Sequence, residues 1–118
     1  MAEKTIHWFK IADSVQALDW QSNNMLVVEV NDTKVSLAQF NQKLFAFAYK
    51  CPHASGIMAN GFIDAVGNAV CPLHRYKFNL TTGRNTSGEG YYLKKYLVEE
   101  RVDGVYVGFE AKKFFSFL

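Results

Sequence analysis

Residues 51–83 read CPHASGIMANGFIDAVGNAVCPLHRYKFNLTTG, and two short pairs of cysteine and histidine lie within this stretch. The first pair is Cys51-x-His53, and the second, after seventeen intervening residues, is Cys71-x-x-His74. These are the only two cysteines in the chain. Thiolate sulfur together with imidazole nitrogen is a ligand set that holds transition metals or iron–sulfur clusters. The four residues are therefore candidate metal ligands.

Each cysteine is followed directly by a proline, Pro52 or Pro72. Proline fixes the backbone at low entropic cost, so both ligand loops look preorganised. A doubled pattern of this kind disfavours the reading of the cysteines as ordinary small core residues. A zinc site stays open on the residues alone, although zinc ligands are more often separated by two to four residues. A disulfide is disfavoured, because the chain has few cysteines and shows no pattern of a secretory signal.

The same stretch resembles the cluster-binding region of the Rieske family, from the first pair through residues 60–64 to residues 70–83. The [2Fe-2S] cluster of that family has one iron on two cysteines and the other on two histidines. The resemblance implies one such cluster as the cofactor. It implies that Cys51 and Cys71 bind the inner iron, while His53 and His74 bind the outer iron near the surface. Outside the stretch, the resemblance is one of size and strand pattern only.

The rest of the chain shows short strand patterns separated by turns. Alternating, aromatic or β-branched segments predict strands at residues 5–11, 25–30, 33–40, 44–49, 96–101 and 105–109. Asn31-Asp32 predicts one hairpin turn and Asp103-Gly104 another. Residues 13–19 predict the one helical turn, with Asp13 or Ser14 as its cap. His7, the histidine outside the pairs, is predicted to be a strand residue.

These patterns predict an all-β protein, either an antiparallel sandwich or a small barrel. The Rieske resemblance implies an antiparallel β-sandwich with a small cluster-binding subdomain at about residues 49–82, and residues 1–118 fit a single domain. Four glycines are expected where the backbone needs positive φ or comes close to the site: Gly56, Gly61, Gly67 and Gly83. For Gly67 we expect an ordinary surface turn.

Composition excludes several classes of function. The formal net charge of the 118 residues is +2, which is too small for a nucleic-acid-binding protein. No apolar run approaches the length of a membrane span, so no membrane partner is expected and a cytoplasmic location is predicted. Lys50, Arg75 and Lys77 adjoin the ligands in sequence and predict a basic rim around the site.

No catalytic constellation accompanies the two pairs, so the chain is predicted to be an electron-transfer protein and not an enzyme. The resemblance implies a soluble ferredoxin, similar to the ferredoxin component of ring-hydroxylating dioxygenase systems. Its partners would be a flavoprotein reductase, which supplies electrons, and a terminal oxygenase, which receives them. The alternative is the small subunit of an assimilatory nitrite reductase, bound to a large sirohaem subunit.

The sequence departs from the Rieske pattern in its third loop and around its ligands. Many members have a proline-rich segment over the cluster, whereas this chain reads Ser87-Gly88-Glu89-Gly90 there. High-potential members resemble one another in an extra disulfide and in serine and tyrosine hydroxyls that donate to the cluster. In this chain, Gly56 and Leu73 stand at the positions of the two disulfide cysteines. Tyr76 stands at the position of the serine and Phe78 at that of the tyrosine. Loss of such donors predicts a low reduction potential, unless Tyr76 reaches back and donates from a different direction.

Overall fold

The structure is a computed structural model that describes residues 3–53 and 55–113. Its strands are β1 (Glu3–Ala12), β2 (Met25–Val30), β3 (Thr33–Phe40), β4 (Lys43–Ala48), β5 (Phe62–Ile63), β6 (Asn68–Val70), β7 (Lys77–Asn79), β8 (Lys95–Arg101) and β9 (Gly104–Lys113). Two short 3-10 helices are η1 (Val15–Ala17) and η2 (Met58–Asn60). The predicted all-β class is confirmed.

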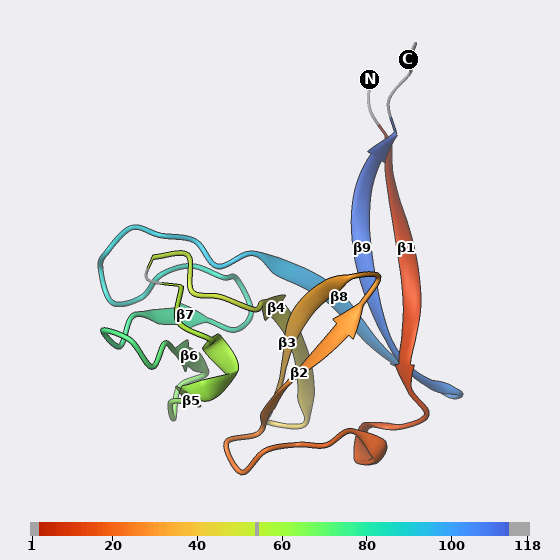
Figure 1. Cartoon of the computed structure of the whole chain (residues 1–118), viewed down its shortest axis with the longest axis horizontal. Helices are drawn as coiled ribbons and strands as arrows, with labels where there is room; N and C mark the ends of the chain where they lie inside the picture. The colour runs from red at the N-terminus through yellow and green to blue at the C-terminus, as the bar shows by residue number, and fades with distance from the viewer. Residues whose placement is uncertain (1–2, 54, 114–118) are drawn as a thin grey trace.

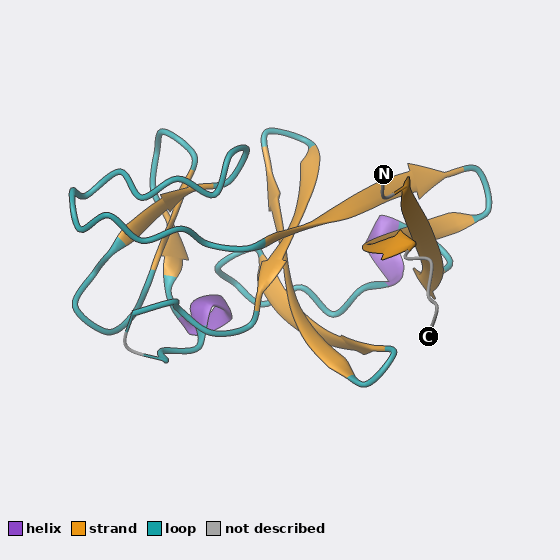
Figure 2. Ribbon diagram, turned by 90° about the horizontal axis from the view of Figure 1, so that it is seen from above, coloured by secondary structure: helices purple, strands orange, loops and turns teal. Residues whose placement is uncertain are grey.

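All strand pairs are antiparallel, and they form two sheets. A six-stranded sheet has the order β1-β9-β8-β4-β3-β2, and a three-stranded sheet has the order β5-β6-β7. In Figure 1 the small sheet lies at one end of the molecule, while β1 and β9 form a long ribbon that leaves the other end. Loops dominate the end that carries the small sheet, as Figure 2 shows.

Two tight turns explain how β2, β3 and β4 follow one another. Asn31 and Asp32 have φ of 51° and 62°, and Asn41 and Gln42 have φ of 51° and 64°. Two consecutive residues with positive φ match the twist of a two-residue hairpin, and asparagine tolerates this conformation well. The predicted hairpin of residues 25–30 and 33–40 is confirmed. The predicted central strand is confirmed as well, since β4 pairs with both β3 and β8.

The β8–β9 hairpin corrects one prediction. Arg101 pairs with Gly104, so the turn consists of Val102 and Asp103 and not of Asp103-Gly104. Gly104 belongs to β9, where an added Cβ would lie 2.5 Å from the carbonyl oxygen of Ala12. The glycine is therefore needed for close approach to the end of β1. Strand β9 also runs past the predicted residue 109 to Lys113, because it pairs with β1 along this length.

Two hydrophobic clusters make up the core. One lies on the six-stranded sheet and includes Leu37 and Val107. The other joins the small sheet to β2, β3 and β4, and it contains Phe47, Phe78 and both cysteines. Phe47 and Phe78 have exposed fractions of 1% and 0%, and burying an aromatic ring of this size contributes about 2 kcal/mol. The second cluster thus fixes the small sheet, and with it the candidate ligand loops, to the main sheet.

The predicted helical turn is confirmed as η1. The side chain of Ser14 accepts a hydrogen bond of 3.1 Å from the backbone N–H of Ala17, so Ser14 and not Asp13 is the cap. His7 lies on β1 and faces solvent, as its prediction as a strand residue required. Within the described ranges, no helix has the length and apolar character needed to cross a membrane.

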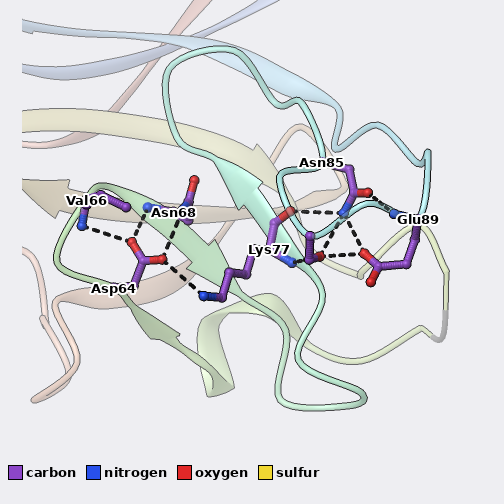
Figure 3. Close-up of polar contacts among 7 residues, drawn as sticks. Asp64, Val66, Asn68, Lys77, Asn85 and Glu89 are labelled. Atoms are coloured by element: carbon purple, nitrogen blue, oxygen red, sulfur yellow. Dashed lines mark hydrogen bonds and ion pairs between the residues drawn. The ribbon is translucent and has the colours of Figure 1, made fainter.

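The turn between β5 and β6 is organised by the carboxylate of Asp64, as Figure 3 shows. Its oxygens accept hydrogen bonds from the backbone N–H groups of Val66 (3.1 Å) and Asn68 (2.9 Å) and from Asn68 Nδ2 (2.9 Å). Gly67 has φ of +92° and is buried beside Phe40, so the expectation of a surface turn is wrong at this position. The glycine is required by both its backbone conformation and its packing.

We expect Asp64→Asn to destabilise the protein by about 1 to 2 kcal/mol at neutral pH, because one acceptor oxygen would be replaced by a donor facing Asn68. Burial disfavours the carboxylate, but hydrogen bonds from Asn68 and Val66 and the charge of Lys77 outweigh it and lower the pKa of Asp64. A lowered folded-state pKa stabilises the protein above the unfolded-state value, and this contribution is lost as pH falls. The difference between wild type and variant should therefore shrink below about pH 4. Thermal unfolding from pH 7 to pH 3 measures it, and a constant difference would contradict this role.

Candidate metal centre

Two loops of the same construction carry the four candidate ligands. In the first, the N–H of Cys51 donates a 2.7 Å hydrogen bond to the carbonyl of Gly56. In the second, the N–H of Cys71 donates a 2.9 Å hydrogen bond to the carbonyl of Tyr76. Each cysteine is thus bonded to the residue five places later. The first loop follows β4 and the second follows β6, so rigid strands fix the separation of the loops.

The thiols lie inside the molecule. Cys51 and Cys71 have exposed fractions of 3% and 0%, and both are free of disulfides. Burial raises the pKa of the Cys71 thiol to about 11, while the backbone N–H of Leu73 acts in the opposite direction and Cys51 adds to the rise. Metal binding requires the thiolate, so a cation that binds here must displace the proton of the buried thiol.

The imidazoles lie outside the thiols. His53 and His74 are both exposed, and their ring centroids are 5.5 Å apart. His74 adopts φ of 64° and Arg75 adopts φ of 58°, which turns the second loop sharply at its histidine. The structure therefore brings the two predicted imidazole ligands together at the surface, while both predicted thiol ligands are buried.

Two glycines let the backbone close around this site. A Cβ added at Gly56 would lie 2.9 Å from Cys71 Sγ, so the first loop passes directly over the sulfur of the second. A Cβ added at Gly61 would overlap the carbonyl oxygen of Val70, which no shift of a side chain relieves. The expectation of close approach at these two positions is confirmed.

Tyrosine rings surround His53. The ring of Tyr76 stacks on it at 4.4 Å between centroids with an interplanar angle of 27°, and the ring of Tyr91 lies 5.2 Å away. The Tyr76 hydroxyl is 3.5 Å from His53 Nε2. The sequence indicates Tyr76 as a residue able to reach back to the site, but it does not identify Tyr91. Only the position of Tyr91 after a glycine-rich stretch gives any signal, and that signal is weak.

The donor set fits a two-iron cluster. Among the residues that the structure describes, no three His, Cys, Asp or Glu side chains converge on one point in the manner of a single-ion site. A Rieske cluster asks for two protein ligands at each iron, two thiolates at one and two imidazoles at the other. Cys51 and Cys71 are both buried, and His53 and His74 are both exposed with ring centroids 5.5 Å apart, so the four side chains divide in the way that such a cluster would need.

The basic rim is only partly present. Lys50 and Arg75 are exposed beside the ligand loops. The ammonium group of Lys77, by contrast, lies 3.8 Å from Asp64 Oδ2 and points toward the β5–β6 turn. The charge of Lys77 is therefore partly neutralised. The basic rim consists of Lys50 and Arg75, whereas the sequence predicted three cations.

Comparison with known proteins agrees with the geometry. Residues 7–95 match the sequence profile described as Rieske [2Fe-2S] domain. The ferredoxin component of the naphthalene 1,2-dioxygenase system of Pseudomonas aeruginosa is 29% identical over 76 residues, which are 64% of this chain and 71% of that protein.

Two solved structures show the same fold. The ferredoxin of carbazole 1,9a-dioxygenase from Nocardioides aromaticivorans IC177 superposes with a TM-score of 0.73 at 20% identity, covering 85% of this chain and 95% of that one. A putative NADH-dependent nitrite reductase small subunit from Mycobacterium tuberculosis gives a TM-score of 0.77 at 17% identity, covering 91% and 98%. Since the profile match spans most of the chain and includes both ligand loops, the protein belongs to the Rieske [2Fe-2S] domain family and its cofactor is a Rieske-type [2Fe-2S] cluster.

Proposed function

We propose that this protein is a one-electron carrier whose cluster is held by Cys51 and Cys71 at the inner iron and by His53 and His74 at the outer iron. The observation that carries the proposal is the layering of the site, with buried thiols beneath exposed imidazoles. When bound, the cluster supplies a centre that takes up a single electron with little rearrangement. The exposed imidazoles offer the shortest path between that centre and a partner.

The surrounding residues support such a role. The inner ligands belong to the core cluster with Phe47 and Phe78, which excludes water from the sulfur side. Met58 is fully buried there, whereas Leu73 is 47% exposed at the outer rim. Because the sulfur side is buried and the histidine side is exposed, a partner can approach the cluster closely only from the histidine side. The apolar residues of the two loops are thus divided between the core, where Met58 lies, and the rim, where Leu73 lies.

We propose a flavoprotein reductase as the electron donor and a terminal oxygenase as the acceptor. This proposal is supported by the similarity of the chain to two proteins that are named as ferredoxins of dioxygenase systems. Exposed Lys50 and Arg75, which adjoin Cys51 and His74 in sequence, suit partners with an acidic docking face, because complementary charge raises the rate of encounter. We further propose that residues 1–118 act as one domain, with residues 49–82 as its cluster-binding part.

A second candidate is the small subunit of an assimilatory nitrite reductase. It is supported by the similarity of the fold to a putative subunit of that kind, over nearly the whole of both chains. In that case the large sirohaem subunit would be a permanent partner, and the exposed histidine edge would be covered in the assembly.

Anaerobic titration of the holoprotein separates the two functions. A carrier should accept one electron per molecule from NADH through a flavoprotein ferredoxin reductase and return it to a soluble oxidant, while it elutes as a separate species on size exclusion. A stable complex of equal stoichiometry with a sirohaem-containing large subunit would instead support the second candidate. Uptake of no electron at all would overturn both.

A further inference from the structure

The segment of residues 84–92, here called the third loop, has no role in the ligand set but comes close to it. It begins and ends at an isolated bridge between Arg84 and Tyr92, and a second bridge ties Asn85 to Phe78 of β7. The N–H of Thr86 donates a 2.8 Å hydrogen bond to the carbonyl of Lys77. The start of the loop thus pairs with β7 at the edge of the small sheet, and the end of the loop returns to the candidate metal centre.

Asn85 is the centre of this loop, as Figure 3 shows. Its Oδ1 accepts hydrogen bonds from the backbone N–H groups of Glu89 (2.5 Å) and Gly90 (2.8 Å). Its Nδ2 donates to the carbonyl of Lys77 (3.0 Å), to Ser87 Oγ (3.1 Å) and to Glu89 Oε1 (2.9 Å). One amide side chain therefore joins the start of the loop, its far end and β7.

Neighbouring residues complete the same network. Ser87 Oγ donates to Glu89 Oε1 at 2.5 Å and accepts from the backbone N–H of Lys77 at 2.9 Å. Gly88 and Gly90 have φ of +96° and +88°, conformations that glycine adopts without strain. Hydrogen bonds and glycine turns therefore hold this loop, which contains no proline.

The residue that follows this network is Tyr91, which is 41% exposed. Its ring stacks on Tyr76 at 5.9 Å with an interplanar angle of 26° and lies 5.2 Å from the ring of His53. Tyr91 directly follows Gly90, whose N–H donates a hydrogen bond to Asn85 Oδ1. A continuous chain of contacts thus leads from Asn85 to the ring of His53.

We propose that Asn85 is a positioning residue, which holds Tyr91 against Tyr76 and His53 as a cover over the histidine edge of the cluster. This inference rests on the proposed assignment of His53 as a ligand. The stacked tyrosines would slow the access of water and small reagents to the outer iron. An edge covered by flat aromatic rings would still admit a protein partner, because such rings form part of a docking surface.

The test uses the holoprotein and two measurements, hydrogen exchange of the Glu89 and Gly90 amides and the rate of iron loss to an excess of EDTA. Asn85→Ala should speed both by about tenfold or more, since it removes every bond that the Asn85 amide makes within the loop. Tyr91→Leu should speed iron loss while exchange of the two amides stays nearly unchanged. Tyr92→Leu is the matched control, since Tyr92 is the neighbouring tyrosine and is 61% exposed, and it should alter neither rate.

Unchanged iron loss in Asn85→Ala, despite faster exchange of the two amides, would overturn the proposal. Equal effects of Tyr91→Leu and Tyr92→Leu would also overturn it. Glu89→Ala, which removes one exposed carboxylate from the network, provides a milder loosening if Asn85→Ala does not fold, and it should change both rates in the same direction. Failure of the ligand assignment is recognised separately, since His53→Ala would then keep its full iron content.

Discussion

Replacing Cys51 or Cys71 with serine should remove the [2Fe-2S] cluster, with iron content falling below about a tenth of the wild-type value. A hydroxyl oxygen is a hard and weakly acidic ligand, and both positions are buried, so water could not complete the coordination in its place. His53→Ala and His74→Ala should lose the cluster or leave an unstable remnant. Iron analysis of protein expressed with added iron measures the result.

His7→Ala is the matched control, because His7 is exposed on β1 and lies outside both ligand loops. It should keep full iron and the wild-type spectrum. Full iron in any cysteine or histidine variant of the two loops would refute the assignment of that residue, while loss of iron in His7→Ala would show that the assay reports folding in general.

The reduction potential should lie near the low end of the Rieske range, at about −150 mV. Donors to cluster sulfur stabilise the more negative reduced state, and the two hydroxyls of high-potential members are displaced in this chain, where Tyr76 stands at the serine position and Phe78 at the tyrosine position. Phe78 carries no hydroxyl, and the hydroxyl of Tyr76 faces His53 Nε2 at 3.5 Å. Protein-film voltammetry at neutral pH measures the midpoint. A value well above 0 mV would show that other groups donate to the sulfurs.

Tyr76→Phe is the control for the predicted potential. If the Tyr76 hydroxyl serves the ring of His53 and not the cluster sulfurs, its removal should shift the midpoint by less than about 60 mV, the one-electron equivalent of a tenfold change in relative affinity. A larger fall would identify Tyr76 as a sulfur donor in the holoprotein.

Much of the large sheet was predictable because its signals are local. Asn31-Asp32 predicts a turn because these residue types tolerate positive φ. The apolar run of residues 44–49 predicts a central strand, and β4 pairs with a strand on each side. The Asp103-Gly104 turn was misplaced by one residue, since Gly104 serves close approach to the carbonyl of Ala12 and not a turn. Sequence alone does not distinguish these two uses of glycine.

The small sheet shows the limit of such reasoning. Its strands have two or three residues, which is too few for any periodicity to appear. The candidate ligand pairs could be identified from the sequence because two cysteine–histidine pairs at short spacing are typical of metal and cluster sites and of little else. Asn85 and Tyr91 were not, because their contacts depend on how a loop folds back over the site, and an asparagine in a polar loop is too common to signal its five hydrogen bonds.

Pulsed paramagnetic resonance of the dithionite-reduced protein, grown with nitrogen-15 histidine, tests the central claim most directly. A cluster with two imidazole ligands should show hyperfine coupling to two histidine nitrogens, because unpaired spin on the outer iron reaches directly bonded atoms. His53→Ala and His74→Ala should give no cluster signal, or a weak signal from the remnant that lacks one of the two couplings, while His7→Ala should give the wild-type spectrum. A cluster signal without nitrogen coupling, or a colourless protein that contains one zinc ion, would contradict the account.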